Sequence, residues 1–137
     1  MRSHLMSGGV PGAYAFNRTR GTYLATELEL ARTHWSRFRG LMATDPRQFR
    51  AGQGLWIVPC HGVHTLGMRF AIDALYLDDN NVVVHLEENL KPWRFAAVRR
   101  KATSVLELPH ETVSATGTSL GDKIEIALGH AEKAQTA

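Results

Sequence analysis

The chain has a single cysteine, Cys60, among its 137 residues. One thiol cannot form an internal disulfide, nor can it build a zinc site from several thiolates. The sequence also lacks an apolar run long enough to cross a bilayer as a helix. Its N-terminus has no continuous apolar stretch of the secretory type. These absences favour a cytoplasmic protein without a membrane span, stabilised by an ordinary hydrophobic core.

Neither sign of charge dominates the chain. The formal net charge is +3 and the sequence pI is about 9.4. Neutralising phosphates requires clustered cations, so this mild excess permits a nucleic acid partner without arguing for one. Apolar residues make up 44% and charged residues 21% of the chain, as in ordinary soluble proteins. The length fits one domain with its own core.

Composition divides the chain into three parts. Residues 1–21 are rich in Gly, Ser and Arg without an apolar period, which predicts a flexible N-terminal lead-in. Residues 22–128 are predicted to form the single domain, and residues 129–137 a disordered tail. For the first residues we advance the hypothesis that RSHLM is a cloning remnant before a native start at Met6, which mass analysis of the native product would test.

Most of the domain is predicted to be β structure. Between Thr22 and Ala31 the apolar residues Leu24, Leu28 and Leu30 share one parity, as in a half-buried strand. Asn and Asp tolerate positive φ, so the run Asp78-Asp79-Asn80-Asn81 predicts a hairpin turn. Further strands are expected at residues 55–58, 70–77, 82–87, 104–108 and 122–128.

Only brief helices are expected. Thr33 is predicted to cap a short helix over residues 33–42, with Trp35 and Phe38 at helical spacing. Residues 109–115 are predicted to form a helical turn. Short strands, frequent turn signals and brief helices favour a mainly β fold, a small antiparallel β-sandwich or barrel-like single domain, over a βαβ fold.

The segment from Cys60 to Met68 is the densest unusual stretch. It contains a thiol, two imidazoles, a hydroxyl and a thioether directly after a buried-looking strand. Asp73 follows among apolar residues, where a carboxylate needs a partner. We therefore expect a binding or accessory module with a polar pocket at this segment. The candidate ligand-binding residues are Arg39, Cys60, His61, His64, Thr65, Asp73 and Glu107. For Glu107 the alternative is a solvated strand face.

A metal site is a second possibility for this segment. Cys60, His64 and Met68 are ligand types suited to zinc or copper. In an extended strand each would lie about 13 Å from the next, at roughly 3.3 Å per residue. Ligands of one ion must converge to within about 4 Å, so only a sharply folded loop would close the site. The alternative is that His61 or His64 bonds to the backbone and Met68 lies in the core.

Two catalytic interpretations remain open, and the residues do not decide whether the protein is an enzyme. Cys60 as a nucleophile would need a base within reach, whereas the adjacent His61 points to the opposite face of a strand. The alternative is a small buried hydrophobe. His64 and Asp73 would be base and orienter in a hydrolase-like or metal-assisted enzyme.

The predicted loop 89–101 interleaves cations with aromatic residues. Its candidate contacts for single-stranded nucleic acid are Trp93, Arg94, Arg99 and Arg100. Bases stack on rings while cations follow the phosphate backbone. A solvated loop with Trp93 packed into the surface is the alternative. Because the cluster occupies one loop of a nearly balanced chain, a small molecule or a protein is preferred as the partner.

A set of short segments forms a recognisable pattern. In chain order they are Arg39-Gly40-Leu41-Met42, Gly54-Leu55-Trp56, His64-Thr65-Leu66-Gly67-Met68, Ile72-Asp73, Leu75-Tyr76-Leu77-Asp78, Val105-Leu106-Glu107-Leu108 and Gly121-Asp122. Their order and spacing resemble the bacterial and archaeal domain-of-unknown-function family 192 over about residues 22–128. The resemblance implies a compact β-sandwich-like domain and supplies no catalytic mechanism.

The chain departs from the family at one segment. Many members carry Trp-Met-Lys-Asn-Thr followed by Pro-Leu-Asp. Here His64 takes the place of the Trp, Thr65 of the Met, Met68 of the Thr and Ala71 of the Pro, whereas Asp73 keeps its place. The sequence thus resembles a Cys-His-x-Val-His-Thr branch, and ligands of the commoner form do not transfer to it.

Overall fold

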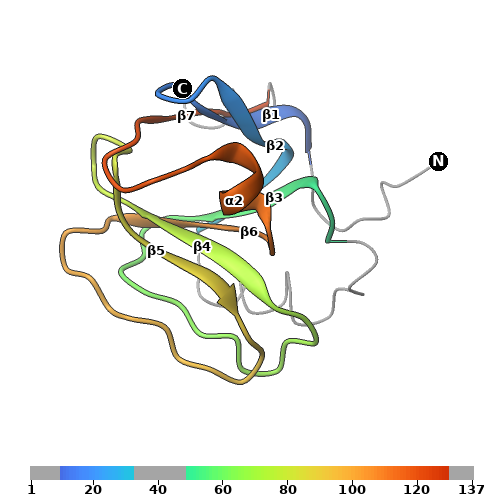
Figure 1. Cartoon of the computed structure of the whole chain (residues 1–137), viewed down its shortest axis with the longest axis vertical. Helices are drawn as coiled ribbons and strands as arrows, with labels where there is room; N and C mark the ends of the chain where they lie inside the picture. Colours follow the sequence, from blue (N-terminus) through green and yellow to red (C-terminus); the bar gives the residue numbers. More distant parts are fainter. Residues whose placement is uncertain (1–9, 33–48, 130–137) are drawn as a thin grey trace.

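The computed structural model describes residues 10–32 and 49–129. These residues form seven strands and one short helix (Figure 1). The elements are β1 (Val10–Asn17), β2 (Thr22–Ala31), β3 (Gly52–Ile57), β4 (Ile72–Leu77), β5 (Val83–Leu90), β6 (Ser104–Pro109), α2 (Thr112–Thr116) and β7 (Ile124–Ala127).

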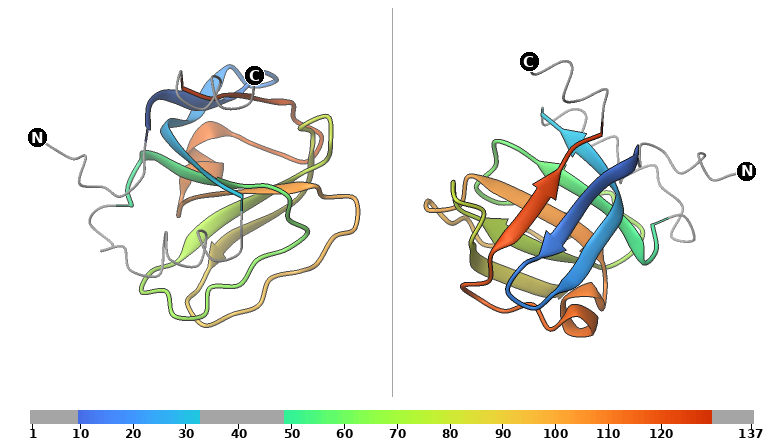
Figure 2. Two further views of the ribbon diagram at one scale, coloured as in Figure 1. Left: turned by 180° about the vertical axis from the view of Figure 1, so that it is seen from behind. Right: turned by 90° about the horizontal axis from the view of Figure 1, so that it is seen from above.

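All seven strands belong to one sheet, in the order β5-β4-β6-β3-β2-β1-β7. Its two outer strands approach each other where Val82 bridges Lys123 and the Val83 N–H donates to the carbonyl of Asp122 at 2.9 Å. The sheet therefore curls into a small barrel, visible from behind and from above in Figure 2. Closing a sheet in this way leaves little exposed strand edge.

The prediction of a mainly β single domain with a short helix is confirmed. Five of the six neighbouring strand pairs are antiparallel, and β2 and β3 run parallel. Parallel neighbours need a long crossover. Residues 32–51 separate these two strands and are long enough for one. This parallel pair makes the sheet mixed, a detail that strand patterns alone did not indicate.

Strand β1 corrects the prediction of a flexible lead-in over residues 1–21. Residues 10–17 pair with β2 on one side and with β7 on the other. The inward positions of this strand include Ala13 and Ala15, both buried. Alanine carries too weak a hydrophobic signal to reveal an alternation, so the strand escaped sequence analysis. Residues 1–9, the predicted helix over 33–42 and residues 130–137 lie outside the described residues.

The other predicted elements agree closely with the structure. The predicted hairpin turn is present: Asp78 Oδ1 accepts the N–H groups of Asn80 and Val82, each at 2.9 Å, and Asn81 has a φ of 60°. In β2 the predicted parity is kept by Leu24 and Leu28 and then lost. Leu30 is only half-buried, and Ala31, on the other parity, is buried. A register shift of the β-bulge type lies earlier in the strand, between Ala25 and Glu27.

Both faces of β4 and β6 are buried, which divides the core in two. One cluster fills the barrel; it includes Leu24, Leu28, Leu75, Leu77, Leu106, Leu108, Val113 and Ile124. The second lies on the opposite face of the same strands; it includes Phe49, Ile57, Cys60, Val63, Met68, Ile72, Tyr76 and Ala102. Residues 58–71 and 91–103, which run side by side in Figures 1 and 2, contribute to this second cluster. We call these two segments the loop ribbon.

Candidate functional site

A half-open cleft lies where β6 passes into α2. Its volume is about 310 Å³, at the lower end of the range for small-ligand pockets. The lining residues come from β2, the start of β3, the end of β6 with the turn that follows it, and α2. They are Tyr23, Leu24, Ala51, Gly52, Pro109, His110, Glu111, Thr112, Ala115 and Thr116.

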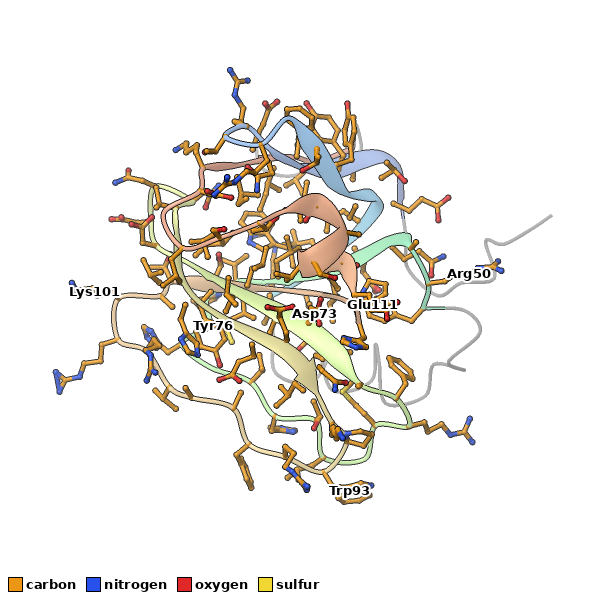
Figure 3. All side chains as sticks on the ribbon, viewed as in Figure 1. Arg50, Asp73, Tyr76, Trp93, Lys101 and Glu111 are labelled. Atoms are coloured by element: carbon orange, nitrogen blue, oxygen red, sulfur yellow. The ribbon has the colours of Figure 1, made fainter. Side chains whose placement is uncertain are left out.

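Asp73 supports the cleft from inside the protein. Its side chain is fully buried on β4. One carboxylate oxygen accepts the N–H of Asn89 at 2.9 Å and Nδ1 of His110 at 3.1 Å, and the other accepts the N–H of Val113 at 2.9 Å. Charge-assisted bonds of this kind satisfy a buried carboxylate. Asp73, labelled in Figure 3, therefore ties the end of β5, the start of α2 and the His110 ring to β4 through these hydrogen bonds.

His110 carries the chemistry that this arrangement offers to a ligand. Its side chain is 38% exposed and lines the cleft. Since a carboxylate only accepts hydrogen bonds, Nδ1 of His110 bears the proton in its bond to Asp73. The second nitrogen, Nε2, is then the acceptor of the neutral ring. Such a carboxylate partner also fixes the orientation of the imidazole.

The residue after His110 has an unusual backbone. Glu111 lies at φ 81° and ψ −3°, in the left-handed region, directly before α2. A non-glycine residue there is strained, and such strain clusters at functional sites. The Glu111 side chain makes no capping bond to the helix. An exposed carboxylate thus stands beside the imidazole at the cleft.

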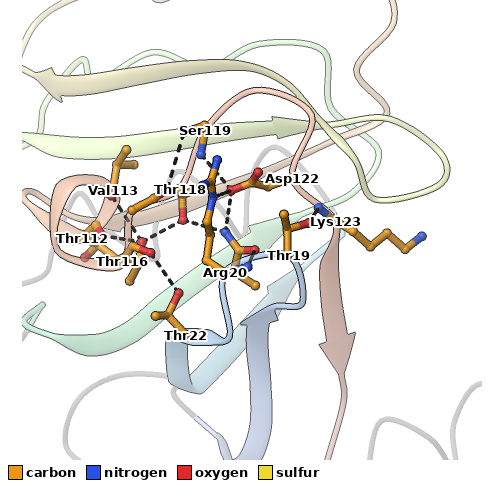
Figure 4. Close-up of polar contacts among 12 residues, drawn as sticks. Thr19, Arg20, Thr22, Thr112, Val113, Thr116, Thr118, Ser119, Asp122 and Lys123 are labelled. Atoms are coloured by element: carbon orange, nitrogen blue, oxygen red, sulfur yellow. Dashed lines mark hydrogen bonds and ion pairs between the residues drawn. The ribbon is translucent and has the colours of Figure 1, made fainter.

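A polar network holds α2 and the turn that follows it (Figure 4). The buried carboxylate of Asp122 accepts bonds from Asn17 Nδ2 at 3.0 Å, Arg20 Nε at 2.9 Å and the Ser119 N–H at 2.9 Å. Burial by itself raises the pKa of Asp122. The bonds from Arg20, Asn17 and Ser119, together with the Arg20 charge, outweigh burial and hold this pKa below its ordinary value.

Threonine hydroxyls extend this network to the cleft. The Thr22 hydroxyl donates to the carbonyl of Thr116 at 3.0 Å, and the hydroxyls of Thr116 and Thr118 bond to each other at 2.7 Å. These bonds join β2 to the end of α2. The network therefore fixes one wall of the cleft relative to the other.

The polar groups predicted at the Cys60–Met68 segment bond mainly to main-chain atoms. The Cys60 thiol donates to the carbonyl of Gly62 at 3.0 Å, and the Thr65 hydroxyl donates to that of Lys91 at 2.6 Å. His61 Nδ1 bonds to the carbonyl of Ala102 at 2.6 Å. His64 Nδ1 accepts the Leu66 N–H at 3.2 Å.

These bonds therefore fasten the loop ribbon, whereas Asp73 bonds to groups at the cleft. Glu107 is buried on β6, in register with Leu55 and Ala74. Arg39 lies outside the described residues.

Two of the three predicted metal ligands are core residues. Cys60 and Met68 are buried in the second core cluster. Among residues 10–32 and 49–129, no three His, Cys, Asp or Glu side chains gather closely enough to hold a metal ion. A zinc or copper site at Cys60, His64 and Met68 stays a prediction from the sequence.

Sequence analysis did not single out the residues that line the cleft. Pro109-His110-Glu111-Thr112 is a polar stretch directly after a buried strand, the same signal that drew attention to the Cys60 segment. It was short and fell within a predicted helical turn. Tyr23 belongs to a strand far away in sequence, and only folding places it beside these residues.

The fold and the cleft together define a small, nearly closed β-barrel domain with a helix-edged pocket. The family model DUF192, described as "Uncharacterized ACR", matches residues 15–126, and the chain belongs to this family. The resemblance drawn from the sequence motifs is thereby confirmed. No helix in the described part of the chain is long and apolar enough to span a membrane.

Relatives in archaea match most of the chain. UPF0127 protein PF1050 of Pyrococcus furiosus is 35% identical over 114 residues, which cover 80% of this chain and 94% of that protein. A UPF0127 protein of Thermococcus sibiricus is 29% identical over 114 residues, covering 80% of this chain and 71% of the relative.

Two solved structures share the fold. A protein of unknown function from Novosphingobium aromaticivorans superposes with a TM-score of 0.68 at 19% identity, covering 82% of this chain and 83% of that one. A protein described as a putative transcription regulator, from Sinorhizobium meliloti, gives a TM-score of 0.67 at 24% identity and covers 83% and 91%. At these identities the likeness concerns the fold alone.

Proposed function

We propose that this protein is a small-molecule binding module whose ligand occupies the cleft at His110. The observation that carries the proposal is the hydrogen bond from the partly exposed His110 ring to the buried carboxylate of Asp73. Two main-chain N–H groups hold the buried Asp73 carboxylate in place, and this carboxylate in turn fixes the orientation of the His110 imidazole. Pre-oriented polar groups in a largely apolar pocket are how small-ligand sites obtain specificity.

The lining residues indicate the chemistry of the ligand. The Nε2 atom of the His110 ring, in the tautomer that donates from Nδ1, and the Glu111 carboxylate are both hydrogen-bond acceptors. Leu24, Pro109 and Ala115 supply apolar wall. A small compound that carries hydroxyl or amino donors on a compact carbon skeleton matches this combination. Such a ligand would suit the cleft volume of about 310 Å³.

The proposal moves the predicted pocket from the Cys60–Met68 segment to the β6–α2 turn. Asp73 belongs to both versions. In the structure its bonds lead to His110 and Val113. The hydroxyl of Thr65 and the thiol of Cys60 donate hydrogen bonds to main-chain carbonyls. The proposed role is still that of a binding module, but the proposed binding site now lies where the contacts of Asp73 lead.

Acid–base catalysis at His110 is the second candidate, favoured by the same hydrogen bond. A carboxylate that fixes the tautomer of an imidazole leaves Nε2 able to take a proton from a bound substrate. This version transfers the base role predicted for His64 to His110. His110→Asn separates the two candidates, because an amide can retain hydrogen bonding in the cleft but cannot act as a base near neutral pH.

The test is a ligand screen monitored by amide NMR, using a library of small hydroxyl- and amino-bearing compounds. Binding compounds should shift the amide signals of Gly52, Glu111, Thr112 and Thr116, and His110→Ala should weaken binding at least about tenfold. The matched control is His85→Ala, since His85 also pairs with a carboxylate, Glu87. Shifts confined to other surfaces, or equal binding by His110→Ala, would refute the proposal.

A further inference from the structure

The loop ribbon concentrates positive charge that the whole-chain balance hides. Residues 58–71 and 91–103 contain six Lys or Arg and no Asp or Glu. The rest of the chain has ten Lys or Arg against thirteen Asp or Glu. A protein of modest net charge is therefore divided into a cationic ribbon and a slightly acidic remainder. The ribbon cations are Arg69, Lys91, Arg94, Arg99, Arg100 and Lys101.

Large apolar side chains are exposed on the same ribbon. Trp93, Phe95 and Val98 are 65%, 76% and 70% exposed. Only two other large hydrophobic residues of the described chain are comparably exposed, Tyr23 and Leu120. Isolated exposed apolar residues need no explanation, but a cluster of them marks an interaction site. Figure 3 places Trp93 and Lys101 on the outer rim of the molecule.

The backbone of the ribbon is fixed, so these side chains are not exposed through loop disorder. Thr65 and Arg94 are joined by a main-chain bond of 2.8 Å, Ala96 donates to Val63 at 3.0 Å, and Arg99 donates to His61 at 2.9 Å. A ribbon ordered before binding loses little further entropy when a partner docks.

Tyr76 fastens the middle of the ribbon to the barrel. Its hydroxyl donates to the carbonyl of Ala97 at 2.5 Å from a fully buried ring on β4. Burial raises the pKa of Tyr76 to about 12. The hydroxyl thus remains a donor at any physiological pH. The buried Tyr76 therefore anchors the main chain between the exposed residues Phe95 and Val98.

We propose that the loop ribbon docks this protein onto an anionic membrane surface. Trp93, Phe95 and Val98 enter the headgroup region, and the flanking cations pair with anionic lipid headgroups. Peripheral binding of this kind depends on buried apolar area together with attraction to anionic lipid. Tryptophan is also the side chain most suited to the membrane–water interface.

Two observations favour a membrane over single-stranded nucleic acid. Nucleic acid platforms combine a cationic groove with ring faces for stacking. Here Trp93 stands on the outer rim, Phe95 and Val98 are exposed, and Val98 has no ring face for a base. An apolar edge flanked by cations therefore matches the flat surface of an anionic membrane better than it matches a single-stranded nucleic acid lying in a groove.

The experiment is co-sedimentation of the whole protein with vesicles of phosphatidylcholine alone or of equal parts phosphatidylcholine and phosphatidylglycerol. We expect binding to the mixed vesicles only. Trp93→Ala combined with Phe95→Ala should weaken it at least about tenfold, from the lost apolar area. Replacing Arg99, Arg100 and Lys101 by Gln should weaken it about a hundredfold. Leu120→Ala, an exposed apolar control away from the ribbon, should bind as the parent does.

Parallel titration with a single-stranded oligonucleotide distinguishes the two anionic partners. Failure to bind the mixed vesicles, or equal binding to phosphatidylcholine alone, would overturn the proposal. Tighter binding to the oligonucleotide that is lost in the same variants would replace the membrane by nucleic acid. Far-UV circular dichroism of each variant checks that folding is intact. The result is independent of the cleft, because no variant changes a cleft residue.

Discussion

The cleft and the loop ribbon use their side chains differently. At the cleft, buried side chains hold the main chain: Asp73 and Asp122 accept N–H groups from turns and from the start of α2. In the ribbon, main-chain bonds join the two segments to each other, as between Thr65 and Arg94, and side chains such as His61 and Thr65 bond to main-chain carbonyls within it. Most polar side chains around the cleft are therefore engaged in hydrogen bonds within the protein, and chiefly His110 and Glu111 can contact a ligand. The ribbon leaves its cations and aromatic rings available to a partner.

This difference predicts where substitutions affect stability and where they affect binding. Removing a buried carboxylate leaves its hydrogen-bond donors without an acceptor, which lowers the free energy of unfolding. Removing an exposed side chain from the ribbon leaves no buried group without a hydrogen-bond partner. Such a substitution should therefore change binding and leave the free energy of unfolding nearly unchanged. Four substitutions test or sharpen this contrast.

Asp73→Asn should have the largest effect, a loss of about 3 kcal/mol in the free energy of unfolding. An uncharged amide cannot accept all three bonds that the carboxylate accepts from Asn89, His110 and Val113. Urea denaturation measures the change. The control Asp79→Asn, on the exposed hairpin turn, should stay within about 0.5 kcal/mol of the parent. A loss below about 1 kcal/mol for Asp73→Asn would mean that the carboxylate does not organise this end.

Thr65→Val should cost about 2 kcal/mol, because it removes a buried hydroxyl that donates to Lys91 and accepts the Arg94 N–H. The Thr65 hydroxyl makes side-chain bonds within the ribbon. Its removal therefore tests whether the main-chain bonds alone keep the ribbon ordered. Hydrogen exchange at Ala96 and Arg99 reports the order of the ribbon. Thr65→Ser keeps the hydroxyl and should retain slow exchange. Rapid exchange at both amides in Thr65→Val alone would show that Thr65 is indispensable to the ribbon.

Arg20→Met should cost about 1 kcal/mol and weaken the acid dependence of stability. The pKa of Asp122 is lowered in the folded protein, in part by Arg20. The stabilisation is therefore complete above the ordinary aspartate pKa of about 4 and is lost as pH falls through the lower folded pKa. Unfolding free energies at a series of acidic pH values measure this slope. The exposed Arg50→Met serves as the control, and an unchanged slope in Arg20→Met would contradict the assignment.

Glu111→Gly should raise the free energy of unfolding slightly, by about 0.5 kcal/mol. Relief of the left-handed conformation outweighs the extra entropy of glycine in the unfolded chain. The same variant should bind cleft compounds less well, since it removes an acceptor. Thermal denaturation and the NMR screen measure the two effects, with Glu111→Gln as the variant that keeps the strain. A destabilised Glu111→Gly would show that the conformation is not strained.

Much of the fold was predictable because its signals are local. The Asp78–Asn81 turn depends on side chains that bond their own backbone, and β2 is indicated by the shared parity of Leu24 and Leu28. Strand β1 was missed because Ala13 and Ala15 bury little apolar area. The parallel pairing of β2 with β3 depends on where a long connection returns, and strand patterns contain no such information.

The site was less predictable, for a related reason. Sequence analysis identified Asp73 as a buried carboxylate in need of a partner, and the structure supplies that partner as His110. The two are separated by 37 residues, and β4 meets β6 only through sheet pairing. Cys60, His61 and Thr65 form a dense polar cluster in sequence, yet their bonds go largely to main-chain carbonyls.

The family, the predominance of β structure, most strand positions and the need of Asp73 for hydrogen-bond partners could all be predicted from the residues in order. Those properties follow from side-chain periodicity, turn chemistry and the cost of burying charge, each of which acts over a few neighbouring residues. The tertiary structure alone decided that the sheet closes into a barrel, that His110 meets Asp73, and that the cations near Trp93 share a ribbon with no acidic residue. These features depend on contacts between distant segments, which only the order of strands in the sheet brings together.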